Sequence, residues 1–157
     1  NFFREFVNLP EPFDGLFMSL NATEVDAESD IPSANGVFTV PFRKLADSTR
    51  NLSIGYDKGK VDMRLSLAER SDYLDYLADD DIETTVDNLN YDNIRFTDDH
   101  SQIDFTAKYY LNDNLTLKLD LININDEPEF YYWGNTSRLS QYDEYGRSAT
   151  IGFTYKY

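Results

Sequence analysis

The sequence predicts an all-β fold: a segment of an antiparallel, up-and-down transmembrane β-barrel. Apolar residues recur at every second position along runs of roughly 9–11 residues, the length that a tilted membrane-spanning strand needs. The connections between these runs alternate between short and long, as they do in outer-membrane barrels. The chain also combines 12 Tyr and 11 Phe with a net charge of -15, whereas aromatic girdles and charged loops occur together in such barrels.

The clearest strand is the end of the chain, "GRSATIGFTYKY". One face of this strand carries the apolar residues Ala149, Ile151, Phe153, Tyr155 and Tyr157. The other face is small and polar, so one side of the strand is wet and the other lies against apolar material. That pattern fits a membrane barrel, and it equally fits the half-buried strand of a soluble sandwich.

The other strands follow from the same alternation. In the first half of the chain we expect strands at residues 2–9, 16–24, 50–56 and 61–68, and a short strand at 37–42 inside a loop that begins at residue 27. In the second half we expect strands at residues 103–111 and 115–121, followed by the final strand. Beyond Leu121 the apolar positions change parity, which indicates either a β-bulge or a strand that leaves the apolar layer. No stretch sustains the apolar spacing of a helix.

Three connections are short and three are long. The short ones are "PEPFDG", "DKGK" and "NDN", whose Pro, Gly, Asp and Asn residues favour turns. The long ones are residues 27–49, 71–100 and 128–146. Because the two kinds alternate along the chain, all short turns fall at one end of the predicted sheet and all long loops at the other.

Charge and composition exclude several classes of function. A net charge of -15 and a pI of about 4.2 argue against nucleic acid as a partner, because phosphate contacts need clustered Lys and Arg. No Cys is present, which excludes thiolate metal sites and disulfides within this sequence. The single His100 stands among Asp and Ser neighbours, but adjacency in sequence does not supply a catalytic geometry, and we expect no enzyme.

Acidic residues concentrate in the predicted loops. Residues 72–100 hold ten acidic residues and one Arg. The simplest interpretation is a solvated loop that keeps the exterior hydrophilic. The alternative is a divalent-cation site made by Asp79, Asp80, Asp81 and Glu83, although their spacing matches no EF-hand loop. No other cofactor is indicated.

Two long stretches carry a resemblance to a known family. They are "YYLNDNLTLKLDLININDEPEFYYWG" (residues 109–134) and "RLSQYDEYGRSATIGFTYKY" (residues 138–157). Their order of a short turn, a Leu-alternating strand, N-x-x-D-E-P, Q-Y-x-x-Y-G-R and an aromatic terminus resembles the C-terminal end of TonB-dependent outer-membrane receptors. The likeness is greatest to the proteobacterial subfamily that is often associated with carbohydrate uptake. The stretches "FVNLPEPFDGLFMSLNATEVDAES" and "RLSLAERSDYL" resemble preceding parts of the same barrel.

The resemblance implies a fold and a location. Residues 1–157 would form the C-terminal part, about the last seven strands, of a roughly 22-stranded plugged barrel in the cell outer membrane. The plug domain and the TonB box are not in this stretch, so it is part of a longer receptor or a truncated relative. The implied partners are outer-membrane lipid, the N-terminal plug, the remaining barrel strands, and TonB through the missing N-terminal part. Phe153, Tyr155 and Tyr157 resemble the signal read by the barrel assembly machinery, with Tyr157 where Phe is commoner.

The implied function is active uptake of a scarce ligand, with a carbohydrate favoured and an iron–siderophore complex second. Tyr131, Tyr132 and Trp133, near Arg138, would stack on a sugar ring or belong to the aromatic girdle. Arg64, Arg70 and Lys108 would face the lumen and contact the ligand or the plug. The alternative from another class is a soluble or surface-associated ligand-binding β-sandwich, in which the alternating apolar faces form a core between the sheets.

Overall fold

The computed structural model describes residues 1–33, 36–77 and 94–157, and in these ranges the chain is all-β with antiparallel sheets. The predicted fold class is confirmed at this level. The described ranges contain one short 3-10 turn, η1 (Phe13–Gly15), and no helix that is long and apolar enough to cross a membrane.

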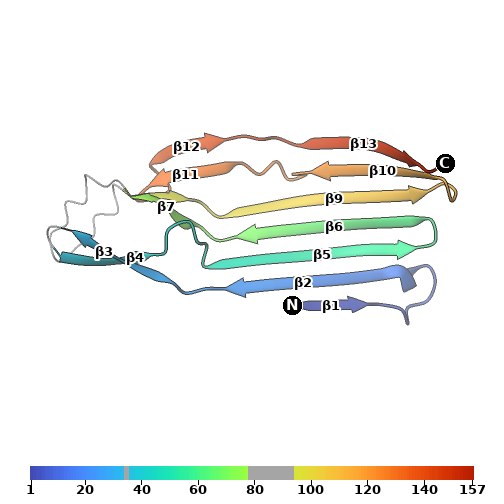
Figure 1. Ribbon diagram of the computed structural model, residues 1–157, viewed down its shortest axis with the longest axis horizontal. Coiled ribbons are helices and arrows are strands. Elements are labelled where there is room, and N and C mark those ends of the chain that lie inside the picture. The colour runs from blue at the N-terminus through green and yellow to red at the C-terminus, as the bar shows by residue number, and fades with distance from the viewer. Residues whose placement is uncertain (34–35, 78–93) are drawn as a thin grey trace.

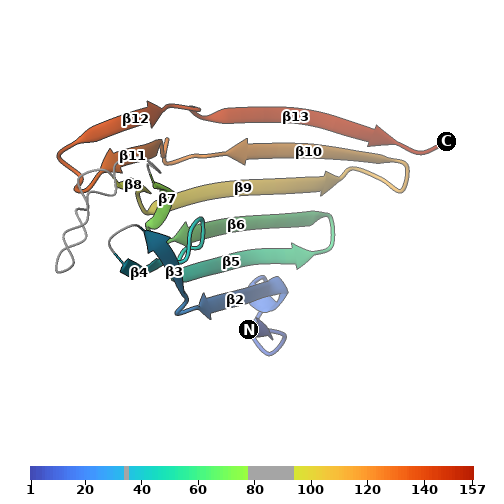
Figure 2. The ribbon, with the colours of Figure 1, turned by 60° about the vertical axis from the view of Figure 1, so that its left-hand side comes forward.

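Seven strands form the main sheet, in the order β1-β2-β5-β6-β9-β10-β13. Their bounds are β1 Phe2–Glu5, β2 Leu16–Glu24, β5 Ser48–Lys58, β6 Val61–Arg70, β9 His100–Tyr110, β10 Leu115–Ile122 and β13 Ser148–Tyr155. Each strand is antiparallel to its neighbours. The first and last strands in sequence are the two edges, and the sheet does not close on itself within the described ranges (Figures 1 and 2).

The connections fall at two ends of the main sheet, as the sequence predicts (Figure 1). At one end, called here the turn end, residues 6–15, 59–60 and 111–114 join neighbouring strands. At the other end, the loop end, residues 25–47, 71–99 and 123–147 leave the sheet and return to it. At the turn end Gly59 has a φ of 63°, a left-handed conformation that suits glycine in a tight hairpin.

The register gives the main sheet one apolar face and one polar face. The apolar face is made of alternating residues of β2, β5, β6, β9, β10 and β13, such as Met18, Leu20, Leu52, Ile54, Met63, Leu65, Phe105, Ala107, Leu117, Leu119, Ile151 and Phe153. The polar face carries the residues between them, such as Ser19, Asn51, Ser53, Asp62, Arg64, Ser66, Arg70, Asp104, Lys108, Lys118, Asp120 and Thr154. Strand geometry places successive side chains on opposite faces, so this segregation follows directly from the alternation in the sequence.

No second sheet covers the apolar face in the ranges that the structure describes. Ile54 and Leu65 lie in the middle of the sheet, yet they are 49% and 47% exposed. A soluble sandwich would bury these residues against a facing sheet. The described chain therefore lacks the inter-sheet core that the sandwich alternative requires.

A small sheet, with the order β12-β11-β8-β7, stands at the loop end. Its strands are β7 Tyr73–Leu77, β8 Ile94–Thr97, β11 Glu129–Trp133 and β12 Leu139–Asp143, and a separate hairpin is made of β3 Glu28–Ser33 and β4 Gly36–Pro41. The short strand predicted at residues 37–42 matches β4, whereas the prediction of loops for β3 and for the strands of the small sheet was wrong. They are short and two of the pairings contain register shifts, so the sequence lacks the long period-two pattern that identifies a strand.

The buried apolar core also lies at the loop end. It comprises Val40, Leu74, Leu77 and Ile94, with Ile31 and Phe96 packed against them. These residues come from the hairpin β3–β4 and from β7 and β8. Within residues 1–33, 36–77 and 94–157, the main sheet contributes none of the buried apolar residues.

The main and small sheets are separated by a break in the strand pairing. At the loop end, β6, β9, β10 and β13 are connected to β7, β8, β11 and β12, respectively. The links are residues 71–72, 98–99, 123–128 and 144–147. Asn123 is buried with a φ of 56°, and its amide group bonds with the backbone of Glu127 and the carbonyl of Gly146. The change of parity beyond Leu121 thus marks the end of a strand. At the N-terminus β1 stops at Glu5, earlier than the predicted strand of residues 2–9.

Candidate functional site

The polar face of the main sheet continues into one face of the small sheet. Pairing places Tyr131 opposite Thr97 and Trp133 opposite Arg95, so these side chains share a face. Tyr73 pairs with Thr97 from the other side, and Glu129 lies two residues before Tyr131. We call this surface the aromatic face, defined by Tyr73, Arg95, Glu129, Tyr131 and Trp133.

Arg95 fixes the middle of the aromatic face. Its guanidinium donates from Nε to Asp75 Oδ2 at 2.7 Å and forms an ion pair with the same oxygen through Nη2. The guanidinium also lies over the ring of Tyr131, 5.2 Å from its centroid. Asp75 is only 7% exposed, so the guanidinium of Arg95 balances the charge of its carboxylate in a site with little access to water. Burial, followed by the neighbouring Glu129, raises the pKa of Tyr131 and keeps its phenol neutral.

Arg70, the last residue of β6, forms the junction between the polar face and the aromatic face. Its Nη2 donates to Glu129 Oε2 at 2.7 Å and its Nη1 donates to the carbonyl of Asp98 at 2.7 Å. The guanidinium also lies 5.0 Å from the centroid of the Tyr73 ring. Arg70, which we predicted to face the lumen, therefore lies on the polar face, and its guanidinium contacts residues of the loop end.

His100 lies beside this junction, in register with Arg70. Its Nδ1 is 3.7 Å from Glu129 Oε1 and has no hydrogen-bond partner among the described residues. Thr97 Oγ1 is also buried without such a partner in that part of the chain. The structure brings no nucleophile–base–acid arrangement to His100 among these neighbours, and the absence of catalytic residues stays a prediction.

Tyr132 lies on the opposite face of β11 from Tyr131 and Trp133. Its ring stacks on Phe96 with centroids 5.5 Å apart, and its hydroxyl donates to Asp72 Oδ2 at 3.2 Å. Burial, reinforced by Asp72, raises the pKa of Tyr132 to about 12. The three aromatic residues that we predicted as one cluster are thus divided. Tyr131 and Trp133 remain candidates for ligand contact, while Tyr132 packs inside.

The remaining predicted residues are not members of the aromatic face, although Arg138 adjoins it. Arg138 is exposed in the turn between β11 and β12, where its carbonyl accepts a hydrogen bond from the backbone N–H of Trp133. Phe153 and Tyr155 point out from the apolar face of the edge strand β13, and Tyr157 lies beyond that strand. Lys108 is on the polar face, where its Nζ pairs with Asp62 Oδ2 at 3.0 Å.

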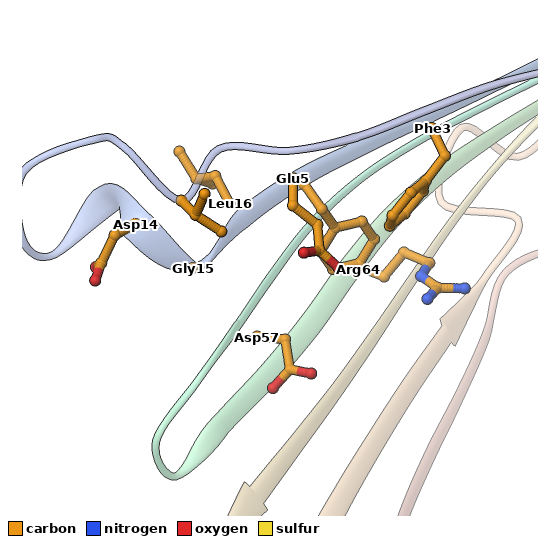
Figure 3. Close-up of a pocket in the computed structure, with 9 residues that line it drawn as sticks. Phe3, Glu5, Asp14, Gly15, Leu16, Asp57 and Arg64 are labelled. Carbon is orange, nitrogen blue, oxygen red and sulfur yellow. The ribbon is translucent and has the colours of Figure 1, made fainter.

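Arg64 lines a second candidate site, a groove of about 330 Å³ at the turn end of the polar face. The groove is bounded by Phe3, Glu5, Val7, Asp14, Gly15, Leu16, Phe17, Asp57 and Arg64. Figure 3 shows Phe3, Glu5 and Arg64 in one part of the groove and Asp57 nearer the β5–β6 turn. Arg64 lies over the Phe17 ring at 5.3 Å. A Cβ on Gly55 would come within 2.1 Å of that ring, so glycine at this position leaves the space that the ring occupies.

The predicted cation ligands Asp79, Asp80, Asp81 and Glu83 lie outside the described residues. Within the described ranges, no group of three His, Cys, Asp or Glu side chains is arranged to hold a metal ion. The cation site therefore stays a prediction.

Sequence reasoning did not identify Tyr73, Asp75, Arg95 or Glu129 as parts of a site. All four lie in segments that we predicted as loops, where partners cannot be deduced from spacing. One signal was present: Arg95 is the one basic residue in the strongly acidic stretch 72–100. An isolated Arg in such a stretch is a natural partner for a buried carboxylate.

Fold and site together define an antiparallel, amphipathic sheet that carries a structured aromatic and charged surface at one end. No protein-family model, curated protein or solved structure matches the chain.

Proposed function

We propose that residues 1–157 form part of the barrel wall of an outer-membrane TonB-dependent receptor that takes up a scarce ligand. The observation that carries this proposal is the uncovered apolar face, which extends across the main sheet from β2 to β13. In water that face would be unfavourably exposed, whereas lipid would cover it. The opposite face, with paired charges such as Lys108 and Asp62, suits a wet lumen.

The two ends of the sheet support the same proposal. Short turns at one end and long connections at the other are the arrangement of outer-membrane barrels. The free edges of β1 and β13 expose unpaired backbone groups, which lipid does not satisfy. The wall therefore needs further strands, which in this proposal come from the rest of the receptor.

The aromatic face is the proposed ligand-contact surface. Flat rings of Tyr131 and Trp133 suit stacking on the apolar face of a sugar ring, and the fixed Arg95–Asp75 pair suits hydrogen bonds to hydroxyl groups. These features favour a carbohydrate over an iron–siderophore complex as the transported ligand.

Two adjacent positions on β6 test the membrane assignment. Leu65 faces the apolar side and Ser66 the polar side, and residues 1–157 contain no Cys, so Leu65→Cys and Ser66→Cys each add one labelling site to this stretch, and any Cys elsewhere in the native protein is replaced beforehand. We expect the label at position 65 to collide mainly with oxygen dissolved in lipid. The label at position 66 should show a higher relative accessibility to a water-soluble nickel chelate.

Equal accessibility of both labels to the nickel chelate in native outer-membrane vesicles would contradict a lipid-facing sheet. The intact mass of the native protein gives an independent check. A mass several-fold larger than 18.2 kDa is expected for a receptor that includes the plug and the remaining strands. A mass near 18.2 kDa would contradict that part of the proposal.

A further inference from the structure

Side chains on both sides contact one another across the break between the main sheet and the small sheet. β6 and β9 stay paired as far as Arg70 and His100, whereas β10 pairs with β9 only as far as Leu121 and Phe105, and the small sheet begins beyond the links. Backbone hydrogen bonds tie some links to neighbouring strands, such as Asp98 N–H to the carbonyl of Phe130, and side-chain contacts across the break add to what orients the small sheet. Among the described side chains of the main sheet, one reaches most of the connections to the small sheet.

Arg70 is that side chain. From the end of β6 it contacts the first residue of β7 through the Tyr73 ring, the β8–β9 link through the carbonyl of Asp98, and the first residue of β11 through Glu129. One guanidinium thus reaches three of the four connections between the sheets. The fourth, β12, is tied in through the pairing of Glu129 with Asp143.

We propose that Arg70 is a positioning residue that sets the orientation of the small sheet and so holds the aromatic face in line with the polar face of the main sheet. The role as a ligand-contact surface rests on the proposed function, but the geometric role of Arg70 does not. Loss of Arg70 removes one contact from each of three connections at once, so the small sheet can then take more than one orientation.

The contacts require the shape of arginine as well as its charge. Nη1 and Nη2 donate to different acceptors, while the flat face of the guanidinium lies over an aromatic ring. A Lys ammonium at the same position is a single point charge and does not satisfy both acceptors and the ring together. Arg70→Lys is therefore expected to keep the attraction to Glu129 and to lose the fixed geometry.

The test measures the distance between the two sheets by double electron–electron resonance. Nitroxides at Asn51 on β5 and Gln141 on β12 report the relation of the main sheet to the small sheet, and both residues are exposed. The full-length protein in lipid vesicles is expected to give one narrow distance distribution. Arg70→Met is expected to broaden the distribution at least twofold or add a second distance, and Arg70→Lys to give an intermediate width.

Arg50→Met is the matched control. Arg50 lies near the same end of the neighbouring strand, on the other face, and its guanidinium has no ion-pair partner within residues 1–33, 36–77 and 94–157. This variant should keep the narrow distribution. If Arg70→Met does not fold, Arg70→Lys decides the question. A width equal to that of the unsubstituted protein in either Arg70 variant, or broadening in the Arg50 control, would overturn the proposal. Because no ligand is added, these outcomes are independent of whether the protein transports one.

Discussion

At the scale of single residues, the Tyr132 hydroxyl connects the small sheet to the link between β6 and β7. The ring is buried in β11 against Phe96, while the hydroxyl donates to Asp72 in the link between β6 and β7. The acceptor is exposed to water, so its carboxylate stays solvated if the hydroxyl is removed. The hydrogen bond therefore orients the Tyr132 side chain and stabilises the folded protein modestly.

We expect Tyr132→Phe to lower the free energy of unfolding by about 0.5–1 kcal/mol, toward the lower end of the range for a hydrogen bond because the partner remains hydrated. Urea titration in lipid vesicles measures this change. Tyr142→Phe is the control, since Tyr142 is 51% exposed on β12 and should leave the stability unchanged. An equal loss in both variants would contradict a specific role for the Tyr132 hydroxyl.

The pKa of Tyr132 gives a prediction at high pH. Its pKa is raised from 10.0 to about 12, so the folded protein favours the neutral phenol. The corresponding stabilisation is fully present below pH 10 and is lost as the pH rises through about 12. The difference in phenolate absorbance between the unsubstituted protein and Tyr132→Phe should show a midpoint near pH 12. A midpoint near 10 would contradict the burial of this phenol.

Asp98, a carboxyl group at the break, also has a raised pKa that links stability to pH, in this case at acid pH. Partial burial, followed by the charges of Asp99 and Asp72, raises its pKa above 3.8. Its protonated form therefore stabilises the fold below pH 3.8, and that contribution is lost as the pH rises through the raised pKa. At neutral pH the ionised Asp98 carboxylate therefore lowers the free energy of unfolding slightly.

We expect Asp98→Asn to raise the free energy of unfolding at pH 7 by on the order of 0.5 kcal/mol, a small value because solvent screens the site. The gain should disappear as the pH approaches 3.8. Unfolding titrations of both proteins from pH 3.5 to 7 measure this trend. A gain that grows toward acid pH would have the wrong sign for a raised pKa.

At the scale of elements, two glycines on the polar face offer a matched comparison. Gly55 in β5 lies beneath the Phe17 ring, whereas a Cβ on Gly152 in β13 would meet nothing within 4 Å. Both glycines lie in strands, where they lack side-chain packing. Only one of them accommodates a neighbouring ring.

Gly55→Ala should lower the free energy of unfolding by about 1–3 kcal/mol, because the Phe17 ring must leave its place over β5 and its contact with Arg64. Gly152→Ala should be neutral or stabilise by up to ~1 kcal/mol, as alanine has less freedom to lose on folding. Denaturant titrations of the two variants under the same conditions compare these effects. The opposite order of stability would contradict the packing described for Phe17.

The strands of the main sheet could be predicted because a sheet with one apolar face and one polar face imposes a strict alternation on the sequence. Leu16–Glu24 was predicted with the bounds that the structure shows, and the two faces of β6 and β9 were assigned correctly. The small sheet could not be predicted, since its strands are short and aromatic or charged side chains occupy both faces. Sequence also identified Tyr131 and Trp133 but not their partner Arg95, because pairing across the sheet depends on register that spacing alone does not reveal.

At the scale of the whole molecule, the two faces of the main sheet differ in how well they tolerate a charged side chain. We expect Leu65→Arg to destabilise the protein in lipid by about 2–4 kcal/mol, the cost of a cation at the lipid face near the middle of the bilayer. Ser66→Arg, one residue further along β6 on the polar face, should cost less than about 1 kcal/mol. Refolding yields and urea titrations in vesicles measure both variants, and equal costs would contradict the assignment of faces.

The uneven distribution of buried residues has a consequence for folding. The cluster around Leu74 and Ile94 excludes water through the protein's own side chains, whereas the main sheet depends on its surroundings to cover it. The loop end is therefore expected to retain slow hydrogen exchange when the lipid is removed, while the seven long strands exchange freely. One polypeptide would then contain two regions that respond to different solvents: a cap that packs in water and a wall that forms only where water is absent.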